Sequence, residues 1–161
     1  MSQLIKALQA AFPEKIEPSE NSSYPAVKVA PADLVAVMQY LRDEQHLNFL
    51  SMLCSADYPE ENAFEVNYIL HSLYEAEEPD EGEAPVVVPK LKKIQVKVRV
   101  PRNNPEVPTV TGVYKGADWQ EREEFDLMGI QFTGHPNLVR VLLPDDFKGH
   151  PLRKDYKGVK L

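Results

Sequence analysis

Carboxylates on a predicted helix in the last third of the chain could do acid-base chemistry. Helical spacing puts Arg122 and Asp126 on one face, with Glu123 three residues before Asp126 and Glu121 close by. Two carboxyl groups that close can share a proton, as catalytic dyads do. In the structural alternative, Arg122 neutralises both carboxylates and fixes the helix against a turn at Gly129. We favour this alternative, because no glycine-rich or nucleophile-bearing sequence surrounds the cluster.

Two histidines could bind a metal ion. His135 and His150 each stand between a glycine and a proline. Together with Asp126, they could form the centre of a stand-alone metal-dependent hydrolase. However, zinc ligands usually occur in closer pairs, such as two histidines one helical turn apart, and 15 residues separate these two. We therefore expect each ring to stabilise its own turn through a hydrogen bond.

The chain lacks the sequence patterns of nucleotide sites and of covalent catalysis. Its glycines match neither the P-loop nor the dinucleotide-binding pattern, and no serine stands in a G-x-S-x-G elbow. The single cysteine, Cys54, cannot form an internal disulfide or supply the four thiolates of an iron-sulfur cluster. It lies in an apolar run, which predicts a buried and unreactive thiol. The sequence therefore predicts no redox centre in this chain.

The last third of the chain carries a long pattern of turn and charged residues. It reads Trp119-x-Glu121-Arg122-Glu123-x-x-Asp126-x-x-Gly129-Ile130-x-Phe132-x-Gly134-His135-Pro136-x-Leu138-x-Arg140, then Asp146-Phe147-x-Gly149-x-Pro151-x-Arg153-Lys154-Asp155-Tyr156. This pattern closely resembles the signature of the 30-kDa type subunit of the proton-translocating NADH:quinone oxidoreductase, respiratory complex I. The departures at Gln120, Met128 and Val139 are small. A match over nearly forty residues is far more specific than a short motif.

The resemblance implies a non-redox structural and assembly subunit in the peripheral arm of an energy-transducing NADH:quinone oxidoreductase. Catalysis would belong to the assembly, with FMN, iron-sulfur clusters and quinone in partner subunits and no cofactor in this one. The isolated chain would be inactive. Similar domains occur in membrane-bound nickel-iron hydrogenases and in the photosynthetic NADH-dehydrogenase-like complex, so the sequence leaves the electron donor open.

The resemblance also implies partners, a location and structural residues. The partners would be other complex I subunits, chiefly the quinone-site subunit and its neighbours in the peripheral arm. The chain would lie on the cytoplasmic side of the cell membrane, or its matrix or stroma equivalent, and reach the membrane only through the complex. The motif residues with an expected structural role are Glu121, Arg122, Glu123, Asp126, Gly129, His135, Pro136, Arg140, Gly149 and Pro151.

Four functional side chains follow one another near the end of the chain: Arg153, Lys154, Asp155 and Tyr156. Arginine pairs with carboxylates through two hydrogen bonds, and tyrosine gives a large amphipathic contact, so both are enriched at interface hot spots. The segment from Leu152 onward has no apolar periodicity with which to bury itself. We expect an extended arm that binds a partner, and an exposed tail is the alternative.

Composition and charge limit the classes of protein. The chain has 161 residues and is 43% hydrophobic, which is enough for one domain with a real core. No apolar run is long enough to span a membrane, and the N-terminus lacks a signal-peptide pattern. Residues 1–90 carry a net charge of -11 and residues 91–161 one of +4, which together give -7. The acidic half would repel phosphate, so we expect no nucleic-acid partner.

Apolar periodicity predicts the elements that position these residues. Helices are expected over residues 2–12 and 31–46. A third is expected over residues 109–127, broken or kinked at its glycines, with Asp118 capping its second part and a left-handed turn at Gly129. Strands are expected over residues 27–29, 48–56, 64–71, 93–100 and 130–132.

We therefore predict an α+β domain, with a mostly antiparallel sheet of about four strands, helices packed on one face, and an extended C-terminal arm. The strand at 48–56 should be buried and the strand at 64–71 half exposed. An ion pair from Glu65 to a lysine on the strand at 93–100 would fit an antiparallel pair. The core domain would cover residues 1–133, with a mobile acidic loop near residues 77–85. Residues 134–161 would form a turn-rich C-terminal extension that docks on a partner subunit.

Overall fold

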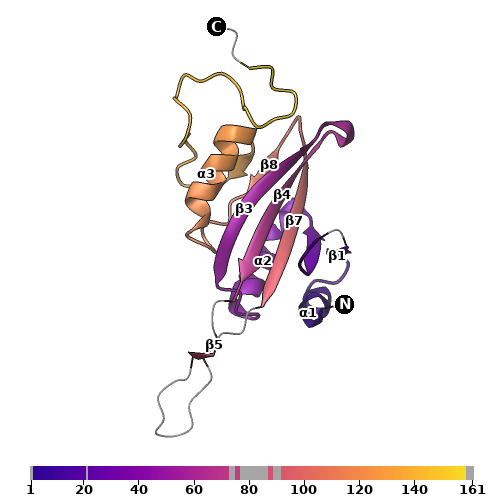
Figure 1. Cartoon of the computed structure of the whole chain (residues 1–161). Coiled ribbons are helices and arrows are strands. Elements are labelled where there is room, and N and C mark those ends of the chain that lie inside the picture. Colours follow the sequence, from indigo (N-terminus) through magenta and orange to yellow (C-terminus); the bar gives the residue numbers. More distant parts are fainter. Residues whose placement is uncertain (1, 21, 73–74, 77–86, 89–91, 159–161) are drawn as a thin grey trace, which may run out of the picture.

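A five-stranded sheet is the centre of the fold. The computed structural model describes residues 2–20, 22–72, 75–76, 87–88 and 92–158. The strand order is β1-β2-β7-β4-β3, and all neighbours are antiparallel except β2 and β7. The bounds are β1 Ile16–Ser19, β2 Ala26–Val29, β3 Phe49–Tyr58, β4 Ala63–His71 and β7 Lys93–Pro101. Figure 1 shows helix α2 behind this sheet and helix α3 beside β3.

Two smaller pairs of strands complete the described sheets. Strands β5 (Glu75–Ala76) and β6 (Val87–Val88) are antiparallel. Strands β8 (Glu106–Pro108) and β9 (Gln131–Thr133) are parallel and lie on either side of α3 in the sequence. The β8–β9 pair therefore holds the start and the end of the α3 region together.

Three α-helices and two short 3-10 helices surround the sheet in the described part of the chain. Their bounds are α1 Gln3–Ala11, η1 Pro31–Asp33, α2 Leu34–Asp43, η2 Pro59–Glu61 and α3 Ala117–Met128. The side chain of Ser2 caps α1 by accepting the N–H of Leu4. The apolar faces of α1 and α2 join one core with alternate residues of the central strands. These core residues are Leu4, Ile5, Leu8, Leu34, Val37, Met38, Leu41, Phe64, Val66, Tyr68, Leu70, Ile94, Val96, Val98 and Val100.

The α+β class and the mostly antiparallel sheet are confirmed, with one strand more than expected. The additional strand is β1, for which the sequence analysis predicted no strand. It is short and sits at the edge of the sheet, where Pro18 needs no N–H for a ladder. Helix α2 ends at Asp43 rather than His46, because His46 has a positive φ of 57°.

Two burial predictions for the strands were wrong. Strand β3 is the edge strand rather than a buried one, and Phe49 and Met52 are 44% and 48% exposed. Strand β4 is buried on both faces rather than half exposed, and Glu65 is only 5% exposed. The predicted ion pair across β4 and β7 is confirmed, since Nζ of Lys97 lies 3.7 Å from Oε1 of Glu65.

The helix expected over residues 109–127 begins only at Ala117. Residues 109–116 form turns, in which the N–H groups of Val113 and Tyr114 bond to the carbonyl of Val110. Asp118 lies inside the first turn of α3, and Gly116 takes the cap position without a side-chain hydrogen bond. The left-handed turn at Gly129 is confirmed by its φ of 74°.

Two further predictions concern the acidic loop and membrane-spanning helices. The acidic segment near residues 77–85, expected to be a mobile loop, lies outside the described residues. Among the helices of the described part of the chain, none is both long enough and apolar enough to cross a bilayer.

Candidate interaction site around helix α3

Asp126, in the last turn of α3, is fully buried and binds the segment that follows the helix. Its Oδ1 accepts a hydrogen bond from Nη1 of Arg140 at 2.6 Å. Its Oδ2 accepts three successive backbone N–H groups, from Val141, Leu142 and Leu143, at 3.0, 2.8 and 3.0 Å. Burial alone would raise the pKa of Asp126, but these hydrogen bonds outweigh it and lower the pKa. The ionised carboxylate therefore fastens this segment to the helix.

Arg122 does not neutralise Asp126, so this part of the structural prediction was wrong. Its Nε donates to the carbonyl of Val139 at 3.1 Å, and its guanidinium lies 4.7 Å from the centre of the Trp119 ring. The partner of Asp126 is Arg140, which follows 14 residues later and not on the helix. Glu123 is exposed while Asp126 is buried. The two carboxyl groups therefore do not form a pair that shares a proton.

The side chain of His135 is fully buried. The backbone N–H of Asn137 donates to its Nδ1 at 3.0 Å, so the proton of the neutral ring must be on Nε2. That nitrogen faces the carbonyl of Asp118 at 3.3 Å, in the first turn of α3. The ring thus stabilises its own turn, as predicted, and also fastens that turn to the helix.

His150 and Gly129 close the other end of α3. The ring of His150 donates from Nδ1 to the carbonyl of Asp126 at 2.9 Å. Burial lowers the pKa of His150, which keeps the ring neutral near neutral pH. A Cβ on Gly129 would lie 2.6 Å from this ring and 2.5 Å from Nη2 of Arg153. The glycine therefore permits both the left-handed turn and the close approach of the C-terminal segment.

The two histidines do not form one metal site. His135 contacts α3 at Asp118 and His150 contacts it at Asp126. Eight helical residues separate these positions, or about 12 Å along the axis. Within the described residues, no three His, Cys, Asp or Glu side chains gather in a way that could hold a metal ion. The geometry gives no support to a hydrolase built on His135, His150 and Asp126.

Arg153 caps the C-terminus of α3 from the segment that was expected to be an arm. Its Nε donates to the carbonyl of Met128 at 2.6 Å and its Nη2 to the carbonyl of Gly129 at 3.4 Å. Its guanidinium lies 5.0 Å from the centre of the Phe64 ring in the core. A cation at the carbonyl end of a helix is favourable, because the helix dipole is negative there.

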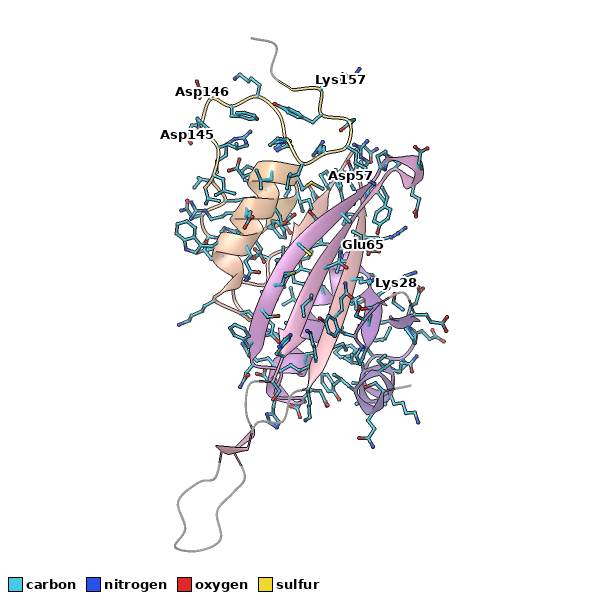
Figure 2. The ribbon with its side chains drawn as sticks, in the orientation of Figure 1. Lys28, Asp57, Glu65, Asp145, Asp146 and Lys157 are labelled. Atoms are coloured by element: carbon cyan, nitrogen blue, oxygen red, sulfur yellow. The ribbon has the colours of Figure 1, made fainter. Side chains whose placement is uncertain are left out.

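The residues after Arg153 also contact their own domain. The backbone N–H of Lys154 donates to Oδ2 of Asp57 at 2.8 Å, and Asp155 pairs with Arg102 at 2.9 Å. Arg102 in turn pairs with Asp57 at 2.8 Å. Figure 2 shows Asp57 at the end of the sheet beneath this segment. The segment from Leu152 onward, in which no apolar periodicity is found, is thus bonded to its own domain, and no sequence pattern marks Asp57 and Arg102 as its anchors.

We expect Arg153→Ala to destabilise the isolated chain by about 2 kcal/mol, because hydrogen bonds from charged groups contribute roughly 1.5 to 3 kcal/mol. Chemical denaturation of the purified chain measures this. Lys154→Ala is the matched control, since the Lys154 side chain is exposed, its ammonium lies 5.9 Å from the centre of the Tyr58 ring, and the substitution keeps the backbone N–H that binds Asp57. Equal stability of the two variants would show that the Arg153 contacts do not hold the helix end.

Two buried carboxyl groups on α3 complete the site. Glu121, fully buried, accepts the N–H of Val110 at 2.8 Å and contacts the hydroxyl of Thr109 at 2.5 Å. Glu124, almost fully buried, accepts the hydroxyl of Ser55. Burial raises the pKa of each to about 7. Sequence reasoning missed Glu124 entirely. The available signal was the polarity of the helix on all sides, because a polar helix that packs must bury some polar side chains.

An exposed apolar strip follows α3 and the segment after it. Trp119, Val139, Leu142 and Leu152 are 66%, 47%, 61% and 59% exposed. Trp119 lies in the first turn of α3, and Leu142 and Leu152 attach to its last turn through their backbone N–H groups. Figure 1 shows the C-terminal segment passing over the end of α3, and Figure 2 shows Asp145 and Asp146 on its outer side. The internal contacts of the motif thus present this strip to the outside.

Comparison with known proteins identifies the family. Residues 27–160 match the family model described as respiratory-chain NADH dehydrogenase, 30 Kd subunit. The NADH-quinone oxidoreductase subunit of this type from Moorella thermoacetica is 43% identical over 157 residues, which cover 98% of this chain and 95% of that protein. Its counterpart in Roseiflexus sp. (strain RS-1) is 42% identical over 156 residues, which cover 94% and 81%. The chain therefore belongs to the family of the 30-kDa subunit of respiratory-chain NADH dehydrogenase.

Solved structures show the same fold. A trypsin-resistant fragment of Nqo5 is 28% identical, with a TM-score of 0.64 over 85% of this chain and 100% of that fragment. A chain of the membrane-bound sulfane sulfur reductase, an archaeal respiratory membrane complex, has a TM-score of 0.66 over 95% and 83%. At 22% identity, this second likeness shows the fold alone.

Proposed function

We propose that this chain is a non-catalytic structural and assembly subunit in the peripheral arm of a complex I type NADH:quinone oxidoreductase. It supports electron transfer from NADH to quinone, coupled to proton translocation, without taking part in the chemistry. The family match over residues 27–160 supports this role. The observation that carries it is the bonding of the motif: the carboxylate of Asp126 and the guanidinium of Arg153 bind backbone groups of this chain.

The cofactors and partners follow from this role. FMN, the iron-sulfur clusters and quinone belong to other subunits, and this chain holds none. Its main partner is the quinone-site subunit, together with neighbouring subunits of the peripheral arm. The chain lies on the cytoplasmic side of the cell membrane, or its matrix or stroma equivalent, and is held there by the complex.

The docking surface in this proposal is the outer side of the C-terminal extension, residues 134–161. Its described part exposes Leu142 and Leu152, which are apolar, and the side chain of Lys154. Burying a Leu side chain at an interface stabilises by roughly 1.5 to 3 kcal/mol, whereas an exposed charge at a rim contributes little. Arg153 and Asp155 fix the shape of this surface through their bonds to the carbonyl of Met128 and to Arg102. We assign the larger share of affinity to the apolar side chains.

Incorporation into the native complex tests the proposal. The double variant Leu142→Ser and Leu152→Ser should fold like the wild type, because both side chains are exposed, yet reduce the intact complex on native gels at least tenfold. The matched control is Phe49→Ser and Met52→Ser, which removes two exposed apolar side chains from β3. Normal incorporation of the first variant would contradict the proposed surface.

Purification of the complex through a tag on this chain tests the role itself. Mass spectrometry of the solubilised membranes should identify the quinone-site subunit and the subunits that hold FMN and iron-sulfur clusters. Hydrogenase or photosynthetic subunits in their place would instead assign the chain to one of those related complexes. Recovery of the chain alone would contradict the proposed role.

A further inference from the structure

Trp119 is the most exposed of the large apolar side chains in the described part of the chain, at 66%. It is also the only tryptophan of the chain. Within the described residues, its indole N–H makes no hydrogen bond. Tryptophan and arginine are among the side chains most enriched at interface hot spots, where they fill pockets of the partner. The groups that surround Trp119 therefore indicate what it binds.

Arg122 lies over the Trp119 ring and is held there. Its guanidinium carbon is 4.7 Å from the centre of the ring, and its Nε donates to the carbonyl of Val139 at 3.1 Å. Among the residues that the structure describes, Nη1 and Nη2 of Arg122 have neither a hydrogen bond nor an ion pair. A guanidinium that stacks on a ring can still donate from its edge. Arg122 thus keeps the donors of both Nη groups for another molecule.

The carboxylates that helical spacing places next to Arg122 are bound elsewhere. Asp118 stands four residues before Arg122 and Asp126 four residues after it, where ion pairs form on a helix. However, Oδ1 of Asp118 lies 3.5 Å from Nε2 of His135. Asp126 pairs with Arg140 instead. The fold therefore leaves Arg122 as a cation without a counter-ion in the described part of the chain.

Trp119 and Arg122 lie close to the proposed docking surface. Val139, whose carbonyl holds Arg122, is 47% exposed. Leu142, whose N–H binds Asp126, is 61% exposed. Trp119 precedes Asp126 by seven residues on the helix, or about 10 Å along the axis. An interface of ordinary size covers about 800 Å² of each partner, which spans this separation. A partner docked on Leu142 therefore reaches Trp119 as well.

We propose that Trp119 and Arg122 form one anchor for a partner subunit, and that the partner presents a carboxylate beside an apolar pocket. The pocket takes the indole ring, and the carboxylate accepts hydrogen bonds from both Nη groups, a planar pairing that arginine favours. Because Arg122 is held before docking, little side-chain entropy is lost on binding. This inference rests on the proposed function and adds the chemistry of the partner's surface.

Incorporation of Trp119→Ala into the native complex tests the anchor. The variant should reduce the intact complex on native gels by about tenfold or more, because a buried tryptophan at a hot spot is lost. The matched control is Tyr24→Ala, which removes a ring that is 37% exposed and lies 3.4 Å from Nζ of Lys93. The control should incorporate normally, and both isolated variants should keep the urea midpoint of the wild type. Normal incorporation of Trp119→Ala, or an equal loss in the control, would overturn the anchor.

A series of substitutions at Arg122 tests the carboxylate. Arg122→Lys keeps the charge but loses the planar donors, Arg122→Gln loses the charge, and Arg122→Glu reverses it. Incorporation should fall in that order, because two carboxylates would meet in the interface of Arg122→Glu. Urea denaturation of each isolated variant provides the comparison. An order of incorporation that follows the stability of the isolated variants rather than their charge would overturn the carboxylate.

The fluorescence of Trp119 separates a protein partner from a lipid surface, because no other tryptophan contributes. Vesicles of phosphatidylcholine and phosphatidylglycerol should leave the emission of the isolated chain unchanged. A blue shift with these vesicles would assign the surface to lipid and overturn the protein anchor. Failure of the proposed function is distinct, because the tagged wild-type chain would then recover no partner subunits and both proposals would fall. If the wild type recovers its partners and Trp119→Ala does so equally well, only the anchor falls.

Discussion

Asp126→Asn is expected to be the most destabilising single substitution in the motif, at about 3 to 5 kcal/mol, because removing one partner of a buried ion pair leaves the remaining charge desolvated. An amide keeps the size of the carboxyl group but loses its charge. Arg140 then lacks its counter-ion, and three N–H donors are weakened at once. Urea denaturation of the isolated chain gives the value directly.

The matched control for this substitution is Asp145→Asn on the exposed outer turn of the same segment. It removes the same charge without touching a buried donor, so its effect should stay within about 0.5 kcal/mol. If the two variants lose the same stability, the loss reflects net charge, and the hydrogen bonds of Asp126 do not hold the segment.

The second large effect is a loss of stability as the pH rises. Burial raises the pKa values of Glu121 and Glu124 from 4.5 to about 7 in the folded chain. At a pH between the unfolded and the folded pKa, the folded chain keeps protons on these carboxyl groups that the unfolded chain has released. The free energy of unfolding therefore falls as pH rises from about 4.5 to about 7, with a slope of up to about 1.4 kcal/mol per pH unit for each carboxyl group.

The contribution of Asp126 to the pH dependence of stability has the opposite sign, because its pKa is lowered in the folded state. Its contribution is complete above the unfolded pKa and is lost as the pH falls through the folded pKa. The two effects together predict maximal stability in mildly acidic solution.

Glu121→Gln and Glu124→Gln should flatten the fall in stability between about pH 5 and about pH 7.5, while Glu123→Gln, on the exposed side of the helix, should not. Urea titrations at the two pH values measure the difference. A stability that is constant or rises over this range in the wild type would show that both carboxyl groups are already ionised in the folded chain.

The parts of the fold that follow from local periodicity could be predicted from the sequence. The alternation from Ile94 to Val100 predicted β7, and the apolar spacing after Pro31 predicted α2. The positive φ of Gly129 follows from its place after a helix. What failed depends on tertiary position. The apolar run at residues 49–56 looks buried, but its composition does not reveal that β3 lies at an edge.

The sequence motif contains several residues of the site, such as Asp126, Gly129 and Arg140, but it did not indicate Glu124 or the bonds between these residues. Helical spacing suggested Arg122 as the partner of Asp126, whereas a loop brings Arg140 to it. The segment after Leu152 has no periodicity and still packs, because it uses backbone N–H groups and one guanidinium rather than an apolar face. Bonds of this kind leave no periodic trace in a sequence, so they appear only when the fold is known.

The anchoring of the C-terminal segment also sets an order of folding. The carboxylate of Asp57 accepts a hydrogen bond from the N–H of Lys154, 97 positions later in the chain. The carboxylate of Asp126 accepts from backbone N–H groups 15 to 17 positions later. Long-range closures of this kind form slowly, because the chain loses entropy before the contact is made. During synthesis the sheet and α3 emerge before these donors do. The outer apolar strip is therefore complete only when nearly the whole chain has been made and folded, and in the proposed docking mode assembly would wait until that point.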